Sequence, residues 1–482
     1  MPSRYIVLAS LIAVALASCT EERPEATSVE WDAPRPEVVS AWRNESPFAY
    51  NTYSDVDRRG RLVAFASSVR DGPAGVYLRN MRTNKILRID VWHTGAQPRP
   101  GSSADEANYR QDSGAPVISA DGRFVAFSSS SPHLVPRDDN GASDLFLYNR
   151  RSRRLRLVST NDRGEQGNRG SLYPSLSADG RFVAFSSRAA NLASATRTHS
   201  VEVYVKDLRT GRIRLVSSGG DERVSGTAWN ASISNDGTRV AFTCDAGDLV
   251  DGDDNRVRDA FVADLSTGDV TLVSVTSDGE SLEPFEYEES ASSYGDGVGE
   301  VAISGDGRTV TFTTHANGLV PQDENNNVDV YVHDLDERTT ERVSVTSDGN
   351  DAYRAKDREC GTNAQCFTFI ASHSTSISDN GRYVAFVSGA PLLDPQELDD
   401  SDSQDEDVFV HDRSTGRTVL VNRSFRGRPV RNNNLYPGSI SGDGRWVSFS
   451  TDGPLLRDKH GRGENGDVYL QRLPLPFRAA RS

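Results

Sequence analysis

The sequence predicts an all-β fold, a single seven-bladed β-propeller formed by residues 37–472. One phrase recurs seven times along the chain, and each copy leads into the same succession of short strands and tight turns. No stretch has the period of an amphipathic helix. Four antiparallel strands in each of many repeats, without helices, are typical of propeller blades.

The recurrent phrase is a short apolar strand, a tight turn and an alternating strand, as in I-S-A-D-G-R-F-V-A-F at Ile118–Phe127. The Asp-Gly or Asn-Gly turn suits a hairpin because glycine tolerates positive φ. The weakest copy is the first, V-D-R-R-G-R-L-V-A-F at Val56–Phe65. The turn glycines of the seven units are Gly60, Gly122, Gly180, Gly237, Gly307, Gly381 and Gly444.

The rest of each unit predicts two further strands. A long connection leads to a third strand such as Asp144–Tyr148, and a second short turn leads to a fourth such as Leu155–Ser159. In a four-stranded meander the first and third connections share one face of the ring. We call it the short-turn face, and the opposite one the long-loop face. Variable loops carry function more often than tight turns, so we expect a partner surface on the long-loop face. Two insertions, Glu280–Glu300 and Gly349–Ser376, are expected there.

The chain ends predict how the ring closes. The seventh unit stops at Asp467–Leu470 and runs into a Pro-rich tail over residues 473–482, so it lacks a fourth strand. Ser40 lies 20 residues before Gly60, and Ser159 lies 21 before Gly180. Residues 37–40 therefore have the spacing of a fourth strand. We predict that they complete the last blade and remove two unpaired sheet edges.

The N-terminus predicts export. Residues 1–18 have the basic start and short apolar run of a signal peptide, and Leu16-Ala17-Ser18-Cys19 resembles the bacterial lipobox. We expect a lipid on Cys19 and a flexible tether over residues 19–36. The alternative is an ordinary secretory signal with an incidental cysteine. The lipoprotein interpretation predicts anchoring at the bacterial cell envelope. Thr20 rather than Asp follows the cysteine, which favours the outer membrane or its periplasmic side.

Charge and cysteine content limit the partners. The net charge of −15 argues against nucleic acid. Membrane contact is expected only through the N-terminal lipid, and a monomer is expected. Cys360 and Cys366 suit a local disulfide in an oxidising compartment. The alternative is a zinc site, but no second pair of Cys or His residues lies nearby at ligand spacing. Cys244 is expected to be a buried thiol in a strand.

One spacing, D-x-N-x-x-x-D, recurs in the second connection of three units. Oxygen side chains converging on a tight loop suit a hard cation such as Ca²⁺. The alternative is that Asp and Asn cap their own turns. The residues concerned are Asp138, Asn140 and Asp144, then Asp253, Asn255 and Asp259, and then Asp323, Asn325 and Asp329.

The phrase S-x-D-G-R-x-V-A-F, followed by D-V-Y-V-x-D and L-V-S, resembles the WD-like propeller repeat of TolB-type periplasmic proteins. The resemblance covers nearly all of residues 37–472 and implies a binding or scaffolding propeller.

The sequence contains no nucleophile elbow and no zinc motif. His333 and His411 lie at a repeat position where other units have Asn, Lys or Ala, so we expect this position to lie on the exposed surface of a strand. The first hypothesis is therefore a non-enzymatic protein with an envelope protein or glycan as partner. The alternative is a carbohydrate-active hydrolase or lyase with dispersed Asp and Glu in the channel, which requires converging carboxylates. An aromatic-lined face would favour binding.

Overall fold

A computed structural model gives the architecture of the chain. The described part contains no helix, and so none that is long and apolar enough to cross a membrane. The structure describes residues 36–40, 50–68, 75–95, 116–194, 200–218, 226–253, 255, 257–282, 297–316, 318–321, 323, 327–350, 352, 372–390, 393, 406–423, 435–436, 438–451 and 467–474.

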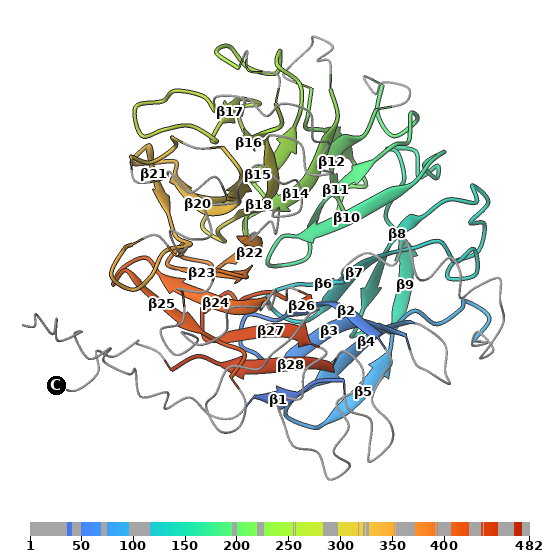
Figure 1. Ribbon diagram of the computed structural model, residues 1–482. Helices are drawn as coiled ribbons and strands as arrows, with labels where there is room; N and C mark the ends of the chain where they lie inside the picture. Colours follow the sequence, from blue (N-terminus) through green and yellow to red (C-terminus); the bar gives the residue numbers. More distant parts are fainter. Residues whose placement is uncertain are drawn as a thin grey trace, which may run out of the picture. The chain divides into compact units, whose positions relative to one another are not determined.

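Seven four-stranded antiparallel sheets form the ring, which confirms the predicted seven-bladed propeller (Figure 1). The first strands are β2 Tyr50–Val56, β6 Val117–Ile118, β10 Ser171–Leu176, β14 Ala228–Ile233, β18 Val298–Ile303, β22 Ser372–Ile377 and β26 Leu435–Tyr436. The second strands are β3 Leu62–Ser68, β7 Phe124–Ser129, β11 Phe182–Ser187, β15 Arg239–Cys244, β19 Thr309–Thr314, β23 Tyr383–Ser388 and β27 Trp446–Thr451.

The third and fourth strands form the outer half of each blade. Blades 1 to 7 are numbered in the order of their first strands along the chain, so blade 1 begins with β2 and blade 7 with β26. The third strands are β4 Gly75–Asn80, β8 Asp144–Asn149, β12 Glu202–Asp207, β16 Asp259–Asp264, β20 Asp329–Asp334, β24 Asp407–Asp412 and β28 Asp467–Arg472. The fourth strands are β5 Lys85–Arg88, β9 Arg154–Leu157, β13 Ile213–Leu215, β17 Val270–Leu272, β21 Thr339–Arg342, β25 Arg417–Leu420 and, for blade 7, β1 Glu37–Val38.

The core lies between the blades. Seven clusters of buried apolar side chains are found among the described residues, and each joins two adjacent blades. The second strand of each blade contributes one fully buried phenylalanine. Its ring centroid lies 5.6 to 6.0 Å from that of an aromatic ring on the third strand of the same blade. These phenylalanines are Phe65, Phe127, Phe185, Phe242, Phe312, Phe386 and Phe449. Burying such rings is the main apolar contribution to stability.

The N-terminal strand closes the ring as predicted. β1 pairs antiparallel with β28, with Glu37 opposite Leu470 and Val38 opposite Tyr469 (Figure 1). Ser40 then donates to Asp467 at 2.7 Å and accepts from the amide of Val468 at 3.1 Å. The same serine-to-acid contact follows the fourth strand of other blades, as between Ser159 and Asp144. Residues 37–40 are therefore a fourth strand with the usual clasp.

The first turns form a second closed circuit, on the short-turn face. One backbone hydrogen bond of 2.8 to 3.4 Å crosses each of the seven blade interfaces there. The turn residues that it joins are Arg58, Ala120, Ala178, Asn235, Gly305 with Asp306, Asp379, and Gly442 with Asp443. The third turn of a blade, which joins its third and fourth strands, lies on this face too. The amide of the residue after the third strand donates to the carbonyl of the residue before the second strand, as the amide of Leu208 does to the carbonyl of Arg181. The predicted division of the two faces is confirmed.

Three side chains lie across this circuit. Asn235 of blade 4 donates to Asp379 of blade 6 at 2.8 Å, and Arg58 of blade 1 pairs with Asp379 at 2.9 Å. The turns that they pass over carry glycine. A Cβ on Gly305 would lie 2.1 Å from the Asn235 amide, and one on Gly442 would lie 2.5 Å from the Asp379 carboxylate. Side chains thus meet over the axis only because these two positions lack them.

The position of His333 and His411 was predicted incorrectly. Both histidines are buried, because the third strand lies against the preceding blade. The Nδ1 atom of His411 contacts Thr418 at 2.9 Å, and Thr418 donates to the carbonyl of Val345 in blade 5 at 2.5 Å. This repeat position therefore links blades rather than facing solvent.

Removing the N-terminal strand tests the closure. Deletion of residues 1–40 exposes the β28 edge and removes the Ser40 clasp, so we expect a lower melting temperature and aggregation. Deletion of residues 1–36 is the control, and it should unfold like the full chain. Equal melting temperatures for both truncations would contradict closure by this strand.

Burial lowers the pKa of His411 to about 4. Because folding lowers this pKa, the stability contributed by the neutral histidine is lost as pH falls from about 6.5 toward 4. His411→Ala introduces the residue that blade 4 has at the same repeat position, Ala263. The unmodified chain and the variant are compared by thermal unfolding. The difference between their free energies of unfolding should be about 2 kcal/mol smaller at pH 5 than at pH 7.5. The exposed His93→Ala is the control, and an unchanged gap would contradict the shifted pKa.

Candidate functional site

The first strands share an irregularity near their start. In five blades one register shift places a bulge in the first strand, close to the long-loop face. First strands of neighbouring blades lie next to one another around the axis (Figure 1). The residues at the bulge position, which we call the mouth, are Tyr53, Tyr173, Asn230, Glu300 and Ser374.

Two tyrosines at the mouth are exposed to solvent. The exposed fractions of Tyr53 and Tyr173 are 41% and 46%, the largest values for aromatic side chains in the described part of the chain. Tyr173 also has a left-handed backbone, with φ of +54°. That conformation costs a side-chain-bearing residue roughly 1 kcal/mol or more. An exposed aromatic residue is thus held in an unfavourable conformation by a bulge.

An aromatic pair spans blades 3 and 4. The rings of Tyr173 and Trp229 lie edge to face with centroids 6.2 Å apart. The guanidinium of Arg188 lies 5.8 Å from the centroid of the Trp229 ring. This side of the mouth presents flat apolar surface with one cation beside it, an arrangement suited to contact with rings or planar groups.

Blades 5 and 6 contribute an acid–histidine cluster. His373 lies 2.9 Å from Glu406, and their side chains are each 31% exposed. Burial opposes the charged imidazole, yet the hydrogen bond to Glu406 and the charges of Glu406 and Glu300 raise the pKa of His373. Glu300 accepts from the amides of Ser374 and Thr375 in the next blade, and burial raises its pKa. The cluster therefore joins two blades.

This arrangement does not support the hydrolase or lyase alternative. Such an enzyme needs two carboxyl groups facing the same bound sugar ring. Glu300 is bound to backbone amides and Glu406 to His373. Within the described ranges, the mouth therefore has exposed aromatic surface rather than a free acid pair.

The last aspartate of each D-x-N-x-x-x-D motif has a structural role. Asp144, Asp259 and Asp329 begin a third strand, and each accepts a 2.5 Å hydrogen bond from a serine after the fourth strand. Glu202 of blade 3, which lacks the motif, makes the same contact with Ser217 at 2.7 Å. The contact belongs to the repeat, so only the first two residues of each motif distinguish these three blades.

In blade 2 the motif is satisfied by hydrogen bonds. Gln166 donates to both Asp138 and Asp144 at 2.7 Å. Asn140 donates to Asp144 and to the carbonyl of Gly167, both at 2.8 Å, while its oxygen accepts from the amide of Ala142. Burial raises the pKa of Asp144 to about 6. The two carboxylates therefore share one amide donor, the Gln166 side chain.

Blade 5 provides its own cation. Arg342 lies 3.0 Å from Asp323 and 3.3 Å from Asp329, and all three side chains are buried. Tyr331 also donates to Asp323. The position of Arg342 is occupied by leucine in blades 2, 3, 4 and 6, at Leu157, Leu215, Leu272 and Leu420. Here an arginine neutralises the paired carboxylates.

Blade 4 keeps the frame of blade 2 without its glutamine. Asn255 donates to the carbonyl of Leu282 at 3.0 Å and accepts from the amide of Val257. Asp253 and Asp259 are buried, and burial raises the pKa of Asp259. Ser281 stands where blade 2 has Gln166. Among the residues that the structure describes, no three His, Cys, Asp or Glu side chains form a group that holds a metal.

Four predicted residues lie outside the described residues: Cys19, Asn325, Cys360 and Cys366. Cys244 is buried in β15, as expected. Among the bulge residues, Glu300 and Ser374 lie within the two insertions expected on the long-loop face. Tyr53, Tyr173, Asn230 and Arg342 were not predicted from the sequence. Alignment of the seven units residue by residue would have pointed to Arg342 and to Arg88 of blade 1, because both stand where four other blades have leucine.

No protein-family model matches the sequence, and no curated protein is significantly similar to it. Similar solved structures include TolB from Acinetobacter baumannii, with 14% identity over 85% of this chain and 79% of that one, and a TM-score of 0.38. A putative TolB from Agrobacterium tumefaciens has 15% identity over 82% and 97%, with a TM-score of 0.39. Hydrazine synthase of Kuenenia stuttgartiensis has 11% identity over 91% and 100%, with a TM-score of 0.41. The fold rests on the chain's own seven sheets, and no function is transferred from these proteins.

Calcium remains a prediction for the D-x-N-x-x-x-D loops, tested by thermal unfolding in excess EDTA and then in millimolar Ca²⁺. Binding to the folded state at a hundredfold excess over Kd adds about 2.7 kcal/mol. We expect the shift to decrease in Asp138→Ala and Asp253→Ala. It should persist in the control Asp323→Ala, because Arg342 already neutralises that loop. No shift in the unmodified chain would leave the loops as self-capped turns.

Proposed function

We propose that this chain is a non-enzymatic binding propeller of the bacterial cell envelope. A lipid on Cys19 anchors it, and its mouth contacts an envelope protein or a glycan. The observation that carries the proposal is Tyr173, which is 46% exposed and has a left-handed backbone. Folding alone gains little from exposing this ring in a strained conformation, whereas a binding surface gains from it.

The rest of the mouth agrees with binding. Tyrosine and tryptophan supply large, rigid contact area at low cost in side-chain entropy, and both are enriched where partners bind most strongly. Tyr53, Tyr173 and Trp229 come from three blades, so a partner would contact several blades at once. The His373–Glu406 pair of blade 6 adds polar groups to another part of the mouth.

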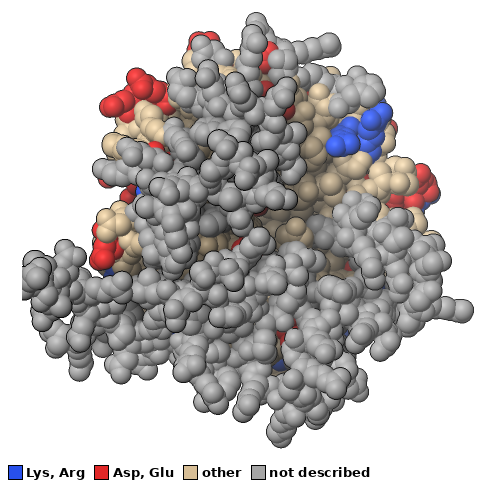
Figure 2. Space-filling model, in the orientation of Figure 1, with Lys and Arg blue, Asp and Glu red and all other residues tan. Residues whose placement is uncertain are grey.

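Surface charge favours a partner other than nucleic acid. The chain has a net charge of −15. Described acidic side chains lie in separate groups along the edge of the face shown in Figure 2. The net negative charge opposes the binding of long phosphate backbones. We expect the protein to act as a monomer, with each blade of the ring completed to four strands within the one chain.

The mouth is tested by placing a photo-crosslinking amino acid at position 53 or 173 in producing cells. We expect a covalent adduct with an envelope protein, or retention on purified peptidoglycan if the partner is a glycan. Leu87 is the matched control, because it is 42% exposed but lies on an outer strand. Adducts of equal yield at position 87, or neither adducts nor retention, would contradict the proposal.

A second variant separates binding from folding. Tyr173→Asn introduces the residue that blade 4 has at the same position, Asn230, which has φ of +55°. Asparagine tolerates this conformation, so the melting temperature should change little. Adduct formation or retention on peptidoglycan should be lost. Retained binding at an unchanged melting temperature would exclude Tyr173 from the site.

A further inference from the structure

A second candidate site lies on the opposite, short-turn face. A pocket of about 650 Å³ opens there over the turns of blades 1 to 3. Five arginines line it, although the chain as a whole is acidic: Arg58, Arg59, Arg61, Arg82 and Arg150. Such a concentration of one charge requires an explanation in the repeat itself.

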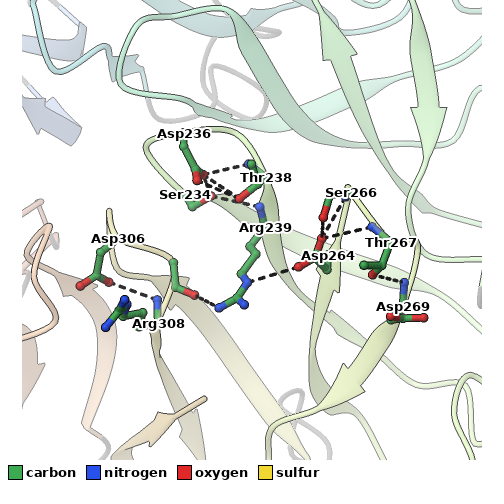
Figure 3. Close-up of polar contacts among 11 residues, drawn as sticks. Ser234, Asp236, Thr238, Arg239, Asp264, Ser266, Thr267, Asp269, Asp306 and Arg308 are labelled. Atoms are coloured by element: carbon green, nitrogen blue, oxygen red, sulfur yellow. Dashed lines mark hydrogen bonds and ion pairs between the residues drawn. The ribbon is translucent and has the colours of Figure 1, made fainter. Parts of the chain in front are cut away.

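Elsewhere on this face the repeat neutralises its own arginines. The arginine that precedes or begins the second strand pairs with the aspartate that ends the third strand. Figure 3 shows this pairing in blade 4, where Arg239 lies 3.5 Å from Asp264. The distance is 2.8 Å for Arg181 and Asp207 in blade 3, and 2.7 Å for Arg382 and Asp412 in blade 6. Blade 5 uses Asp336 for Arg308, at 3.4 Å.

Three consecutive blades lack this partner. The arginine is present in blades 7, 1 and 2, but the residue that ends the third strand is Arg472, Asn80 and Asn149 respectively. None of the three is acidic. The short-turn face therefore has a self-neutralised part over blades 3 to 6 and, over blades 7, 1 and 2, a part whose arginines lack the third-strand aspartate.

The first turn of blade 1 departs from the repeat in the same direction. Arg59 stands where blade 3 has Asp179, and Asp57 stands where blade 3 has Ser177. In blade 3 Ser177 and Asp179 accept from the amides of Phe182 and Arg181.

In blade 1 a single carboxylate does both. Asp57 accepts from the amides of Arg61 and Leu62, at 2.6 and 3.1 Å. The turn is therefore capped without position 59, which leaves that position available for an arginine.

The arginine side chains differ in how they are held. Arg58 pairs with Asp379, and Arg150 donates from Nε to the carbonyl of Gly122 at 2.8 Å, so both are positioned by the fold. The guanidinium groups of Arg59 and Arg82 make no hydrogen bond or ion pair with another described residue, and both side chains are exposed.

Three carboxylates also line the pocket, and each is engaged in its own turn. Asp57 caps the first turn of blade 1. Asp121 accepts from Ser119 and from the amide of Arg123, and Asp179 accepts from Ser177 and from the amide of Arg181. The outward donors of the pocket are therefore guanidinium groups.

We infer that this pocket binds a phosphate group. Guanidinium groups present planar N–H pairs that match phosphate oxygens, and a phosphate carries up to two charges and several acceptors. The group would belong to a soluble polyphosphate or phosphate ester, or to the headgroup of an anionic lipid. This site is independent of the mouth, since it lies at the other end of the axis.

The test uses residues 20–482, which contain the whole ring but not Cys19, so that neither a lipid nor detergent is present. Binding of inorganic tripolyphosphate is measured by calorimetry. Binding to vesicles of phosphatidylcholine, with and without phosphatidylglycerol, is measured by sedimentation. The variant Arg59→Asp with Asn80→Asp gives blade 1 the residues of blade 3. We expect it to keep its melting temperature and to lose at least tenfold in affinity. Arg209→Gln is the matched control, because Arg209 holds in blade 3 the position of Arg82 in blade 1.

Each outcome decides the inference. Tripolyphosphate binding that the double variant loses supports a site for soluble phosphate. Binding only to vesicles with phosphatidylglycerol, lost in the same variant, supports a lipid headgroup. Three results would overturn the inference: no binding of either probe by the unmodified chain, equal binding by the double variant, or an equal loss in Arg209→Gln.

Discussion

Ring closure is the constraint on which the rest of this structure depends. A four-stranded sheet here buries both of its faces only against neighbouring blades, and each apolar cluster belongs to two blades. If the interface between blades 7 and 1 opened, Val39, Phe65 and Val468 would lose their cover together. The chain meets the constraint by using its N-terminal strand as the outer strand of its last blade. The serine-to-acid clasp that ends other blades then also ends this one.

Much of the fold could be predicted because its signals are local. Turn glycines count the blades, strand parity divides the two faces, and the spacing before Gly60 reveals the closing strand. The burial of His411 could not be read in this way, because it depends on a neighbouring blade that the strand's own sequence does not describe. Strand bulges are equally hidden, since one extra residue reverses the alternation within a strand of only six or seven residues, which is too short for the reversal to be recognised. Both tyrosines of the mouth were missed for this reason.

Departures from the repeat were more informative than the repeat. The D-x-N-x-x-x-D spacing combines a structural aspartate, common to most blades, with residues particular to three loops. Arg342 in place of leucine distinguishes blade 5 from blade 2, although their motifs are identical. The weak first copy of the phrase is explained similarly, since Asp57 fulfils the capping role of two residues. A repeat that has a structural reason to stay constant makes each exception a candidate for function.

The circuit of first turns also limits how such a protein can evolve. Large side chains at Asn235 and Asp379 meet over the axis because glycine stands between them at Gly305, and Gly442 similarly separates Asp379 from Arg58. The order of large and small residues therefore fits seven units in this sequence order. Duplication or loss of one unit would bring the wrong residues together at the centre, even if every blade folded correctly. The turn residues at the axis therefore oppose the gain or loss of a whole repeat. In this chain the number of blades is encoded by which turn residues are neighbours, as well as by how many repeats the gene contains.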